Sequence, residues 1–248
     1  MIDDPTGRRN APGAPEHPRL PMSTCFVGDV HGCAAELEEL LAAAGHQAPA
    51  DRLLLTGDAF SRGPDPLGVW RAIRRCGARM VLGNHDAALL ARLRERRRGV
   101  PVRLHSEHQR RLHEALAPVA DELTDWLAAL PVFIREPSFT LVHAGVHPTG
   151  GLQGTTPEQF LNIRLWPPAK GIHGPRWHEH YVPAAPLLVF GHDAPGGLVV
   201  RRHPGGRPYL VGLDTGCVYG HRLSAYLLEE DRIVQVPCHR TGGYWRPS

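Results

Sequence analysis

The chain lacks the features that mark secreted and membrane proteins. Its five cysteines form an odd set with no CxxC pair, so neither a disulfide framework nor a zinc ribbon is indicated, and buried free thiols are expected. No apolar stretch approaches the roughly 18 to 20 residues that span a membrane, and the N-terminus has no apolar segment of the signal-peptide kind. We therefore expect a cytoplasmic protein with no membrane contact and no obligate protein partner.

Lysine is almost absent, because Lys170 is the only one and arginine carries nearly all the positive charge. The net charge of +3 is mild, and genome composition explains the arginine bias better than ligand choice does. The arginines at positions 92, 94 and 96–98 could attract polyphosphate or RNA. A solvated helix end is the favoured interpretation of that run.

The 248 residues suit one α/β domain with a full core. Residues 1–22 are rich in proline, glycine and charge, and we expect them to form a disordered N-terminal tail. The domain is expected over residues 23–240, followed by a C-terminal tail at 241–248. Within the domain, residues 147–183 are rich in proline, glycine, histidine and tryptophan with weak periodicity, which predicts a functional loop or lid.

Strand-like apolar runs alternate with helix-like patterns over the first hundred residues. This βαβαβα order predicts parallel strands joined by right-handed crossovers. The later periodicity predicts a helical region over 104–130 interrupted near Pro118, and then an antiparallel hairpin with its turn at 136–138. The predicted strands are 25–28, 52–56, 79–82, 132–135, 139–143, 187–190, 198–202, 209–213, 223–228 and 233–236, and the first three helices are 34–44, 66–76 and 87–98.

Five of the strand-like runs end in a glycine or a metal-ligand side chain. In CFVGDVHG (25–32), Asp29 and His31 stand two residues apart, a spacing that puts both side chains on one side of an extended backbone. Strand ends at one edge of an α/β sheet are a common place for a site. The other four runs are LLLTGD with Asp58, MVLGNHD with Asn84, TLVHAG with His143 and LLVFGHD with His192.

The six candidate ligands combine carboxylate, imidazole and amide groups. This mixture suits Mn, Fe, Co or Zn and is too rich in nitrogen for a calcium site. Six ligands exceed the needs of one tetrahedral zinc, so the set predicts two cations that share a bridging carboxylate. Asp58, central in the order, is the natural bridge.

The motifs GDVHG, GDxxxRG, GNHD, HAG and GH, in this order, resemble the metallophosphoesterases in their phosphoprotein-phosphatase branch. Within that branch, LTGDAFSRGP, VLGNHDAALLA, DELTDWLAALP, LVHAGV, FGHDA and LDTGCVYG are similar to the symmetrical diadenosine tetraphosphate hydrolases. The resemblance runs from about Thr24 to Leu228. It implies a four-layer α/β/β/α sandwich of two mixed sheets flanked by helices, with a short lid.

The resemblance also implies how the ligands are shared between two divalent ions. We expect Mn2+, with Co2+, Fe or Zn2+ as alternatives. The pair would activate a water for in-line attack on phosphorus. The first ion would be held by Asp29, His31 and Asp58, and the second by Asp58, Asn84, His143 and His192.

Further roles follow from the same resemblance. His85 is expected to protonate the leaving oxygen, and Arg62 to bind phosphate oxygens through its planar fork. Arg164 is a candidate second phosphate ligand from the lid, and Tyr219, with its neighbours Asp214 and Thr215, is expected near the site. Asn84 is expected to contact substrate as well as metal.

Three departures from related patterns bear on the substrate. Ser61 stands where protein phosphatases have an aspartate that holds the catalytic histidine, which favours a nucleotide substrate and leaves Asp86 as the candidate to orient His85. Ala194 replaces the second histidine of the GHxH motif, which disfavours a nuclease of that type. The segment between His143 and His192 is shorter than expected of the full-length hydrolases, so a reduced cap is expected and dinucleotide specificity stays open.

The sequence therefore predicts a hydrolase of phosphoanhydride bonds that cleaves diadenosine tetraphosphate symmetrically to ADP, with RNA caps as further substrates. A serine/threonine phosphoprotein phosphatase or a small-phosphoester phosphatase is the alternative. A non-catalytic nucleotide sensor is a third hypothesis. In the lid, Trp166, Trp177 and Tyr181 could stack on adenine or could simply pack.

Overall fold

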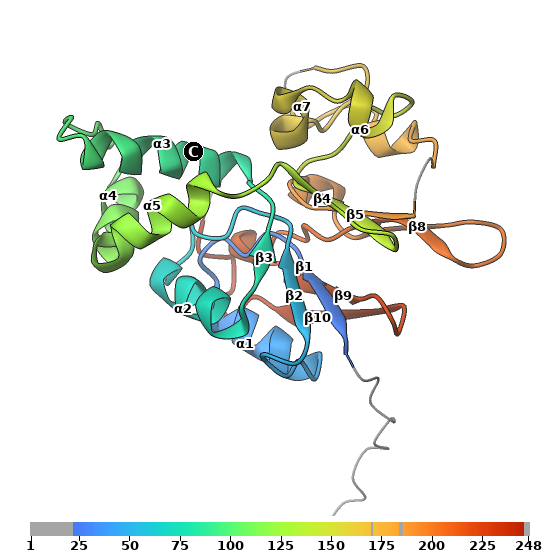
Figure 1. Ribbon diagram of the computed structural model, residues 1–248, viewed down its shortest axis with the longest axis horizontal. Coiled ribbons are helices and arrows are strands. Elements are labelled where there is room, and N and C mark those ends of the chain that lie inside the picture. Colours follow the sequence, from blue (N-terminus) through green and yellow to red (C-terminus); the bar gives the residue numbers. More distant parts are fainter. Residues whose placement is uncertain (1–21, 170, 184–185, 246–248) are drawn as a thin grey trace, which may run out of the picture.

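The computed structural model describes residues 22–169, 171–183 and 186–245. Apart from Met22, the predicted N-terminal tail lies outside the described residues. Two five-stranded mixed sheets face each other, with strand orders β10-β9-β1-β2-β3 and β4-β5-β6-β8-β7 (Figure 1). Helices flank the pair of sheets, which confirms the predicted sandwich of two mixed sheets.

The first sheet is built by the predicted βαβαβ order. Strand β1 (Thr24–Val27) pairs in parallel with β2 (Arg52–Leu55), and β2 pairs in parallel with β3 (Arg79–Met80). Two antiparallel strands, β9 (Arg222–Leu227) and β10 (Arg232–Pro237), complete the other edge.

Helices α1 (Ala34–Ala43) and α2 (Pro66–Cys76) are the crossovers of this sheet. The ends of α2 follow from its sequence. The Asp65 carboxylate accepts a hydrogen bond from the backbone N–H of Gly68, at 2.7 Å, and Gly77 ends the helix in the left-handed conformation at φ 58°.

The second sheet begins with the predicted hairpin of β4 (Phe133–Arg135) and β5 (Phe139–Val142). Strand β5 pairs in parallel with β6 (Leu187–Phe190), and β6 with β8 (Pro208–Gly212). The edge strand β7 (Val199–Arg202) is antiparallel to β8.

Alternation along the strands builds three apolar layers. Phe26 of β1 points between the sheets, where its ring meets Phe139 of β5 edge-on at a centroid distance of 4.8 Å. The neighbouring Cys25 and Val27 point the other way, toward the helices of the first sheet. On the outer face of the second sheet, Trp177 belongs to a third cluster that the 147–183 segment supplies in part. Part of this segment, including Phe160, Ile163 and Trp177, is therefore packed as a layer on the second sheet.

The helical elements include two differences from the predicted boundaries. The third helix, α3, starts at Asn84, three residues before the predicted position, because the Asp86 carboxylate accepts the N–H of Gly83 and completes its first turn. The 147–183 segment contains helical turns of its own. The remaining helices are α3 (Asn84–Arg97), α4 (Glu107–Ala115), α5 (Ala120–Ala128), α6 (Gly151–Gly154) and α7 (Pro157–Asn162), with 3-10 turns η1 (Ala117–Val119), η2 (Trp177–Glu179), η3 (Ala194–Gly196) and η4 (Cys217–Tyr219).

The chain stays attached to the domain beyond residue 240, the predicted boundary. The backbone N–H groups of Tyr244 and Trp245 both donate to the carbonyl of Val218, at 2.8 and 3.0 Å. The described part of the predicted C-terminal tail is therefore packed against η4. No helix in the described ranges is long and apolar enough to cross a membrane.

Candidate metal centre

The six predicted ligands converge around Asp58, where strand ends of the two sheets meet. The Asp58 Oδ2 atom lies 3.7 Å from Nε2 of His31 and 3.7 Å from Nε2 of His143. His143 Nε2 lies 3.1 Å from Oδ1 of Asn84. Two buried groups whose ligand atoms lie within 4.8 Å of one another share Asp58: Asp29 with His31 and Asp58, and Asp58 with His143 and His192.

The backbone is strained at the residues that surround this centre. Five described residues other than glycine have a positive φ, and four of them are His31, Asp58, Arg62 and His192. Such conformations cost free energy and persist where the surrounding structure enforces them, which is common at functional sites. His31, at φ 48°, is not on an extended backbone as its two-residue spacing from Asp29 suggested. The two side chains converge through a turn instead.

Glycines in the GNHD and GHD motifs make room for the carboxylates. A Cβ atom at Gly83 would lie 2.2 Å from Oδ1 of Asp58, and one at Gly191 would lie 2.1 Å from Oδ1 of Asp29. Any side chain at either position would displace a candidate ligand. The glycines of these motifs are therefore part of the site's geometry.

Thr56 holds ligands on both sides of the centre. Its hydroxyl donates to Oδ1 of Asp29 at 2.8 Å, and its backbone carbonyl lies 2.8 Å from Nδ1 of His143. Since a carbonyl can only accept, His143 carries its proton on Nδ1 and presents the lone pair of Nε2 to Asp58 and Asn84. Nε2 of His143, Oδ1 of Asn84 and Oδ2 of Asp58 are all acceptors, so a cation between them would stabilise their approach.

Asp86 holds the backbone beneath Asp58. Its Oδ2 atom accepts the N–H of Asp58 at 2.6 Å, and its Oδ1 atom accepts that of Ala59 at 3.2 Å. The carboxylate is thus occupied by backbone donors, so the geometry does not support the predicted role of orienting the His85 ring. Ser61 lies 3.2 Å from Nδ1 of His31, so it supports a candidate ligand.

Burial shifts the pKa values of the ligands, and a bound cation would reverse the shift of the carboxylates while favouring the neutral imidazoles. Burial raises the pKa of Asp29 and of Asp58 well above the ordinary value, and nearby carboxylates, Asp214 and Asp86 respectively, add to the effect. Burial lowers the pKa of His143 to about 4. In the part of the chain that the structure describes, the buried Nε2 of His192 has no hydrogen-bond partner. The residues present therefore fit a divalent-metal site.

Two arginines flank the centre on different sides. Nη1 of Arg62 lies 3.1 Å from Nε2 of His31, and its guanidinium lies over the Tyr219 ring at 5.6 Å. Arg164, from the segment predicted to be a lid, donates to the backbone carbonyl of His192 at 3.1 Å. The structure thus brings Arg62, Arg164 and Tyr219 close to the candidate metal ligands. The sequence analysis expected all three near the site.

His85 borders the same centre and is partly exposed. Its backbone N–H donates to Oδ1 of Asp58 at 2.9 Å, and its Nε2 lies 4.0 Å from Oδ2 of the same residue. Burial lowers the pKa of His85 to about 3, and the positive charges of Arg62, Arg164 and Arg92 add to this shift. At neutral pH its imidazole is therefore uncharged in the free protein.

Sequence reasoning missed two polar groups that support the arginines or the ligands. Thr56 lies in the quoted LLLTGD run, but its hydroxyl was not recognised as a partner of Asp29. Asp193 follows His192 directly, and its carboxylate lies 3.8 Å from Nε of Arg164 and 3.0 Å from Nε of Arg176. The only signal for Asp193 was its place in the GHD motif.

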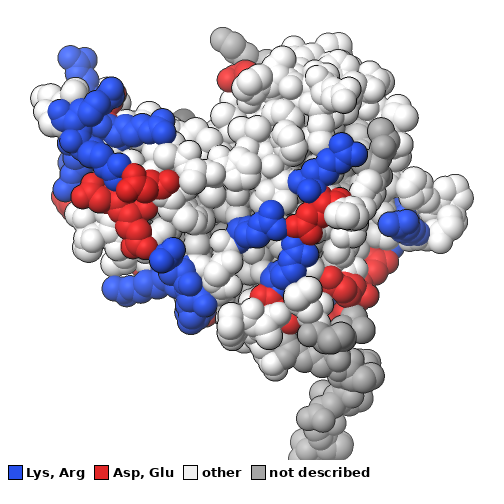
Figure 2. Space-filling model, viewed as in Figure 1, with Lys and Arg blue, Asp and Glu red and all other residues white. Residues whose placement is uncertain are grey.

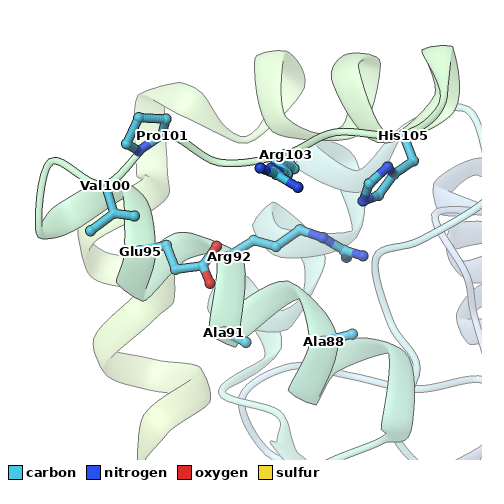
Figure 3. A pocket seen from close by; sticks show the side chains of 8 residues that line it. All are labelled: Ala88, Ala91, Arg92, Glu95, Val100, Pro101, Arg103 and His105. Carbon is cyan, nitrogen blue, oxygen red and sulfur yellow. The ribbon is translucent and has the colours of Figure 1, made fainter.

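Arg92, which the sequence analysis assigned to a solvated basic run, also lies near the site. It lies seven residues after His85 on α3, about two helical turns, so both side chains share one face. Together with His85 and Arg62 it lines a pocket of about 320 Å³. Figure 3 shows Arg92 in an adjoining pocket along α3, opposite Arg103 and His105.

The neighbouring arginines at the end of α3 are exposed, in agreement with the favoured interpretation of a solvated helix end. Figure 2 shows basic side chains gathered at the α3–α4 end of the molecule, next to acidic ones. Arg97 is paired there with Asp121 and Asp125, at 3.2 and 2.6 Å. Arg92 is thus the member of this run that faces the candidate centre.

The three lid aromatics all belong to the outer apolar cluster, with Trp177 buried and Trp166 and Tyr181 half-buried against it. Trp177 is fully buried, and its indole N–H donates to the carbonyl of Ala144 at 3.1 Å. It packs against Phe190 of the second sheet, at a centroid distance of 5.1 Å. Trp177 therefore belongs to the core and cannot stack on a nucleotide.

The fold and the site together define a metallophosphoesterase, an enzyme that uses divalent metal ions to hydrolyse phosphate esters or anhydrides. Residues 22–234 match the sequence model of the Calcineurin-like phosphoesterase family, and the chain belongs to this family.

Proteins named symmetrical bis(5'-nucleosyl)-tetraphosphatase are among its relatives. The protein of Serratia proteamaculans is 45% identical over 282 residues, with 88% of this chain and 95% of that protein covered. The protein of Aeromonas hydrophila is 30% identical over 280 residues, with 88% of this chain and 98% of that protein covered. Both alignments are longer than this chain of 248 residues, so these relatives contain residues that it lacks.

A solved structure gives the same relationship. The structure titled "Crystal structure of a putative diadenosine tetraphosphatase" is 32% identical, with a TM-score of 0.69, and the match covers 89% of this chain and 96% of that one. A yeast protein serine/threonine phosphatase, 12% identical with a TM-score of 0.57, shares the fold.

Proposed function

We propose that this enzyme hydrolyses phosphoanhydride bonds in dinucleoside polyphosphates and cleaves diadenosine tetraphosphate symmetrically into two ADP. The observation that carries the proposal is the distribution of positive charge around Asp58. Arg62 lies beside His31, Arg164 beside His192, and Arg92 beside His85. Guanidinium groups on several sides of one centre suit a chain of phosphates that crosses it.

The ligand set is proposed to hold two divalent cations. Asp29 and His31 would bind one, Asn84, His143 and His192 the other, and Asp58 both. When bound, the cations would supply Lewis-acid stabilisation of the transferred phosphoryl group and lower the pKa of an attacking water. We propose Mn2+ as the native metal, since the mixture of oxygen and nitrogen donors contains no thiolate.

The arginines are proposed to orient and neutralise the phosphates. Arg62 projects beside His31 and is steadied by the Tyr219 ring, and Arg164 is held by the Asp193 carboxylate. Fixed guanidinium groups can bind phosphate oxygens through paired hydrogen bonds and stabilise the charge that develops in the transition state. Asn84 is proposed to contact the same phosphoryl group with its amide nitrogen.

The low pKa of His85 favours anhydrides over alkyl phosphates as substrates. An alkoxide leaving from phosphoserine is about as basic as hydroxide and needs a proton from the enzyme. A nucleoside diphosphate leaves as a phosphate, whose second pKa is about 6, and needs no such donor. A neutral imidazole that donates a hydrogen bond is sufficient for the second reaction and poor for the first.

The pockets next to the centre give room for more than a monophosphate. The pocket of about 320 Å³ beside His85 shares Arg92 with the pocket of about 490 Å³ along α3. It shares Arg62 and Trp245 with a third pocket, of about 440 Å³, which reaches Arg240. Spaces of this size, which share lining residues and are rich in arginine, suit a nucleoside and its phosphates on one side of the cleaved bond.

The test is a product assay with the Mn2+-loaded full-length protein. Diadenosine tetraphosphate should be converted to ADP as the sole nucleotide product. AMP plus ATP, or no turnover with Mn2+, Co2+, Fe2+ or Zn2+, would reject the proposal. Parallel reactions with a capped RNA and a phosphoseryl peptide rank the alternatives, and faster turnover of the peptide would identify a phosphoprotein phosphatase.

Metal content is measured on the same sample. Two ions per chain are expected, and Asp58→Asn should lose both, whereas Asp125→Asn on the surface should keep both.

We also propose that the protein acts in the cytoplasm, where a reducing environment suits its free cysteines.

A further inference from the structure

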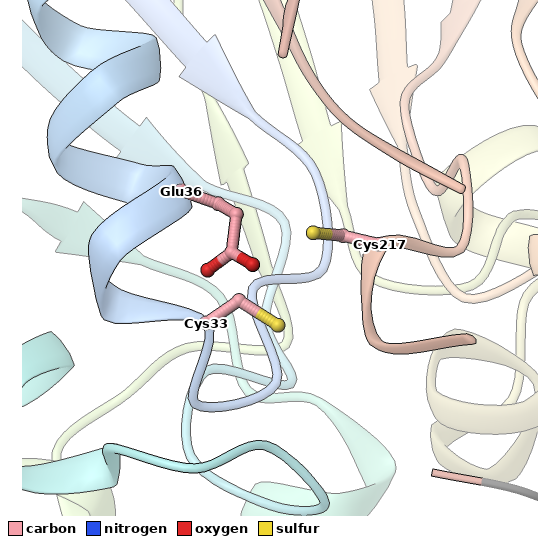
Figure 4. Close-up of side chains that lie close together, drawn as sticks. All are labelled: Cys33, Glu36 and Cys217. Carbon is pink, nitrogen blue, oxygen red and sulfur yellow. The ribbon is translucent and has the colours of Figure 1, made fainter. Parts of the chain in front are cut away.

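A second group of ligand-type side chains lies behind the loop that carries Asp29 and His31. The sulfur atoms of Cys33 and Cys217 and the carboxylate of Glu36 lie within 4.8 Å of one another. All three side chains are buried, with exposed fractions of 0, 1 and 0%. Figure 4 shows Cys33 and Glu36 at the start of α1 facing Cys217 from the η4 turn.

One oxygen of Glu36 is left for a ligand. Its Oε1 atom accepts from the Tyr244 hydroxyl and from the backbone N–H of His239, both at 2.9 Å. Its Oε2 atom is buried and has no hydrogen-bond partner among the described residues. Figure 4 shows the carboxylate directed toward the two sulfurs. A buried carboxylate oxygen without a donor is costly, so the position calls for a positive partner.

A third sulfur, that of Cys238, lies near Cys217 but outside the group whose ligand atoms are all within 4.8 Å of one another. The Cys33 thiol raises the pKa of the Cys217 thiol and the Cys238 thiol lowers it, so both lie near Cys217. Cys238, at the end of β10, is half-buried, so it marks the side from which an ion could enter. Three sulfurs and one carboxylate oxygen make four donors, the number that a tetrahedral ion requires.

We propose that Cys33, Glu36, Cys217 and Cys238 bind a structural Zn2+ ion, separate from the catalytic centre. Thiolates are soft ligands that select zinc over manganese, whereas the centre around Asp58 offers only nitrogen and oxygen. Zinc–sulfur bonds of about 2.3 Å need only a small contraction of the group of Cys33, Glu36 and Cys217. The Cys238 thiol, which donates to the carbonyl of Arg240 at 3.4 Å, would turn toward this group. Binding replaces the three thiol protons, which are released to solvent.

The ion would join three parts of the chain that are distant in sequence. Cys33 directly follows the loop that carries His31, Cys217 belongs to the turn that carries Tyr219, and Cys238 is on the segment that leads to Trp245. Each of these parts borders the catalytic centre or its pockets. The zinc would therefore fix the wall of the substrate pocket without contacting substrate.

Cobalt spectroscopy separates the two sites. Reduced full-length protein loaded with Co2+ should show the intense near-ultraviolet absorption of thiolate-to-cobalt charge transfer, which the sulfur-free catalytic ligands cannot produce. The absorption should disappear on addition of Zn2+. Cys33→Ser and Cys217→Ser should lose it and bind one Co2+ fewer per chain. Cys76→Ser, which alters a buried thiol on α2, should retain it.

The readout does not depend on hydrolysis, so its outcome is independent of the proposed substrate. Glu36→Gln keeps the shape of the side chain and should weaken Co2+ binding at this site while the thiolate absorption stays detectable at high Co2+. Circular dichroism checks that each variant is folded. Absence of the charge-transfer band in the reduced wild-type protein would overturn the proposal, as would its survival in both cysteine variants or a disulfide between Cys33 and Cys217.

Discussion

The first sheet and the second sheet supply the centre in different ways. Asp29 and Asp58 follow strands of the first sheet within short glycine-containing turns, and their positions are enforced by nearby backbone groups. On the second sheet, His143 and His192 also follow strands, but Arg164 comes from the 147–183 segment that packs over the outer face. The metal ligands and Arg62 are thus encoded locally, whereas the position of Arg164 depends on how a distant segment docks.

The largest effect is expected where the two sides meet, at Asp58. Asp58→Asn removes the shared ligand and should lower kcat at least about 10³-fold, with loss of bound metal. The amide can still accept the backbone N–H of His85 through its oxygen, and its NH2 group can donate toward His31 and His143. The metal-free variant should therefore be more thermostable than the metal-free wild type.

This gain in stability should depend on pH. Because the folded-state pKa of Asp58 is raised above its unfolded value, the folded protein binds more protons, and the wild type loses stability as the pH rises through that pKa. Below about pH 4 the carboxyl is protonated in both states and the difference should vanish. Melting temperatures of both metal-free proteins at pH 4 and pH 8 test this. An equal difference at both values would contradict it.

The same contrast explains what could be predicted from the sequence. The six candidate ligands, the parallel order of β1, β2 and β3, and the β4–β5 hairpin were all readable, because each depends on a local pattern of apolar residues, glycines and turns. The position of Arg164 next to His192 was suggested only by resemblance. The role of Asp193 could not be predicted, because both arginines that it pairs with, Arg164 and Arg176, are distant from it in sequence.

One predicted role and one predicted boundary find no support in the structure, for the same physical reason. Asp86 was a plausible partner for His85 by adjacency, yet on the first turn of α3 its carboxylate points back to the N–H groups of Asp58 and Ala59. A sequence pattern does not reveal which side of a turn a carboxylate faces. The packed position of Tyr244 and Trp245 was likewise invisible, because it depends on the η4 turn.

A second prediction tests the docked segment. Arg164→Ala should lower kcat/KM for the dinucleotide about 10- to 100-fold, the cost of a lost charge-assisted contact, and should leave the metal content unchanged. Asp193→Asn should give a smaller loss of the same kind, since it releases the guanidinium without removing it. Steady-state kinetics with metal analysis measure both. A loss of metal in Arg164→Ala would show that the segment also shapes the ligands.

The third prediction concerns the support of the ligands on the first sheet. Thr56→Val keeps the shape of the side chain but removes the hydroxyl that donates to Asp29. Metal affinity should fall about 10- to 100-fold, the usual effect of losing a hydrogen bond to a metal ligand. Because the carbonyl of Thr56 remains, His143 should keep its tautomer, and activity should recover at high metal concentration. Failure to recover would place Thr56 in a wider structural role.

The smallest effect is expected along α3, where Arg92 and Arg97 allow a matched comparison on one helix. Arg92→Ala should raise KM for diadenosine tetraphosphate several-fold with little change in kcat, because the arginine lines the pockets beside His85 and would contact phosphates away from the cleaved bond. Arg97→Ala removes a charge that is already paired with Asp121 and Asp125, so KM should not change. The increase for Arg92→Ala should also shrink at high ionic strength, since salt screens a partly exposed contact. Equal KM values for the two variants would mean that the phosphate chain does not extend along α3, and that the pocket shown in Figure 3 lies outside the substrate path.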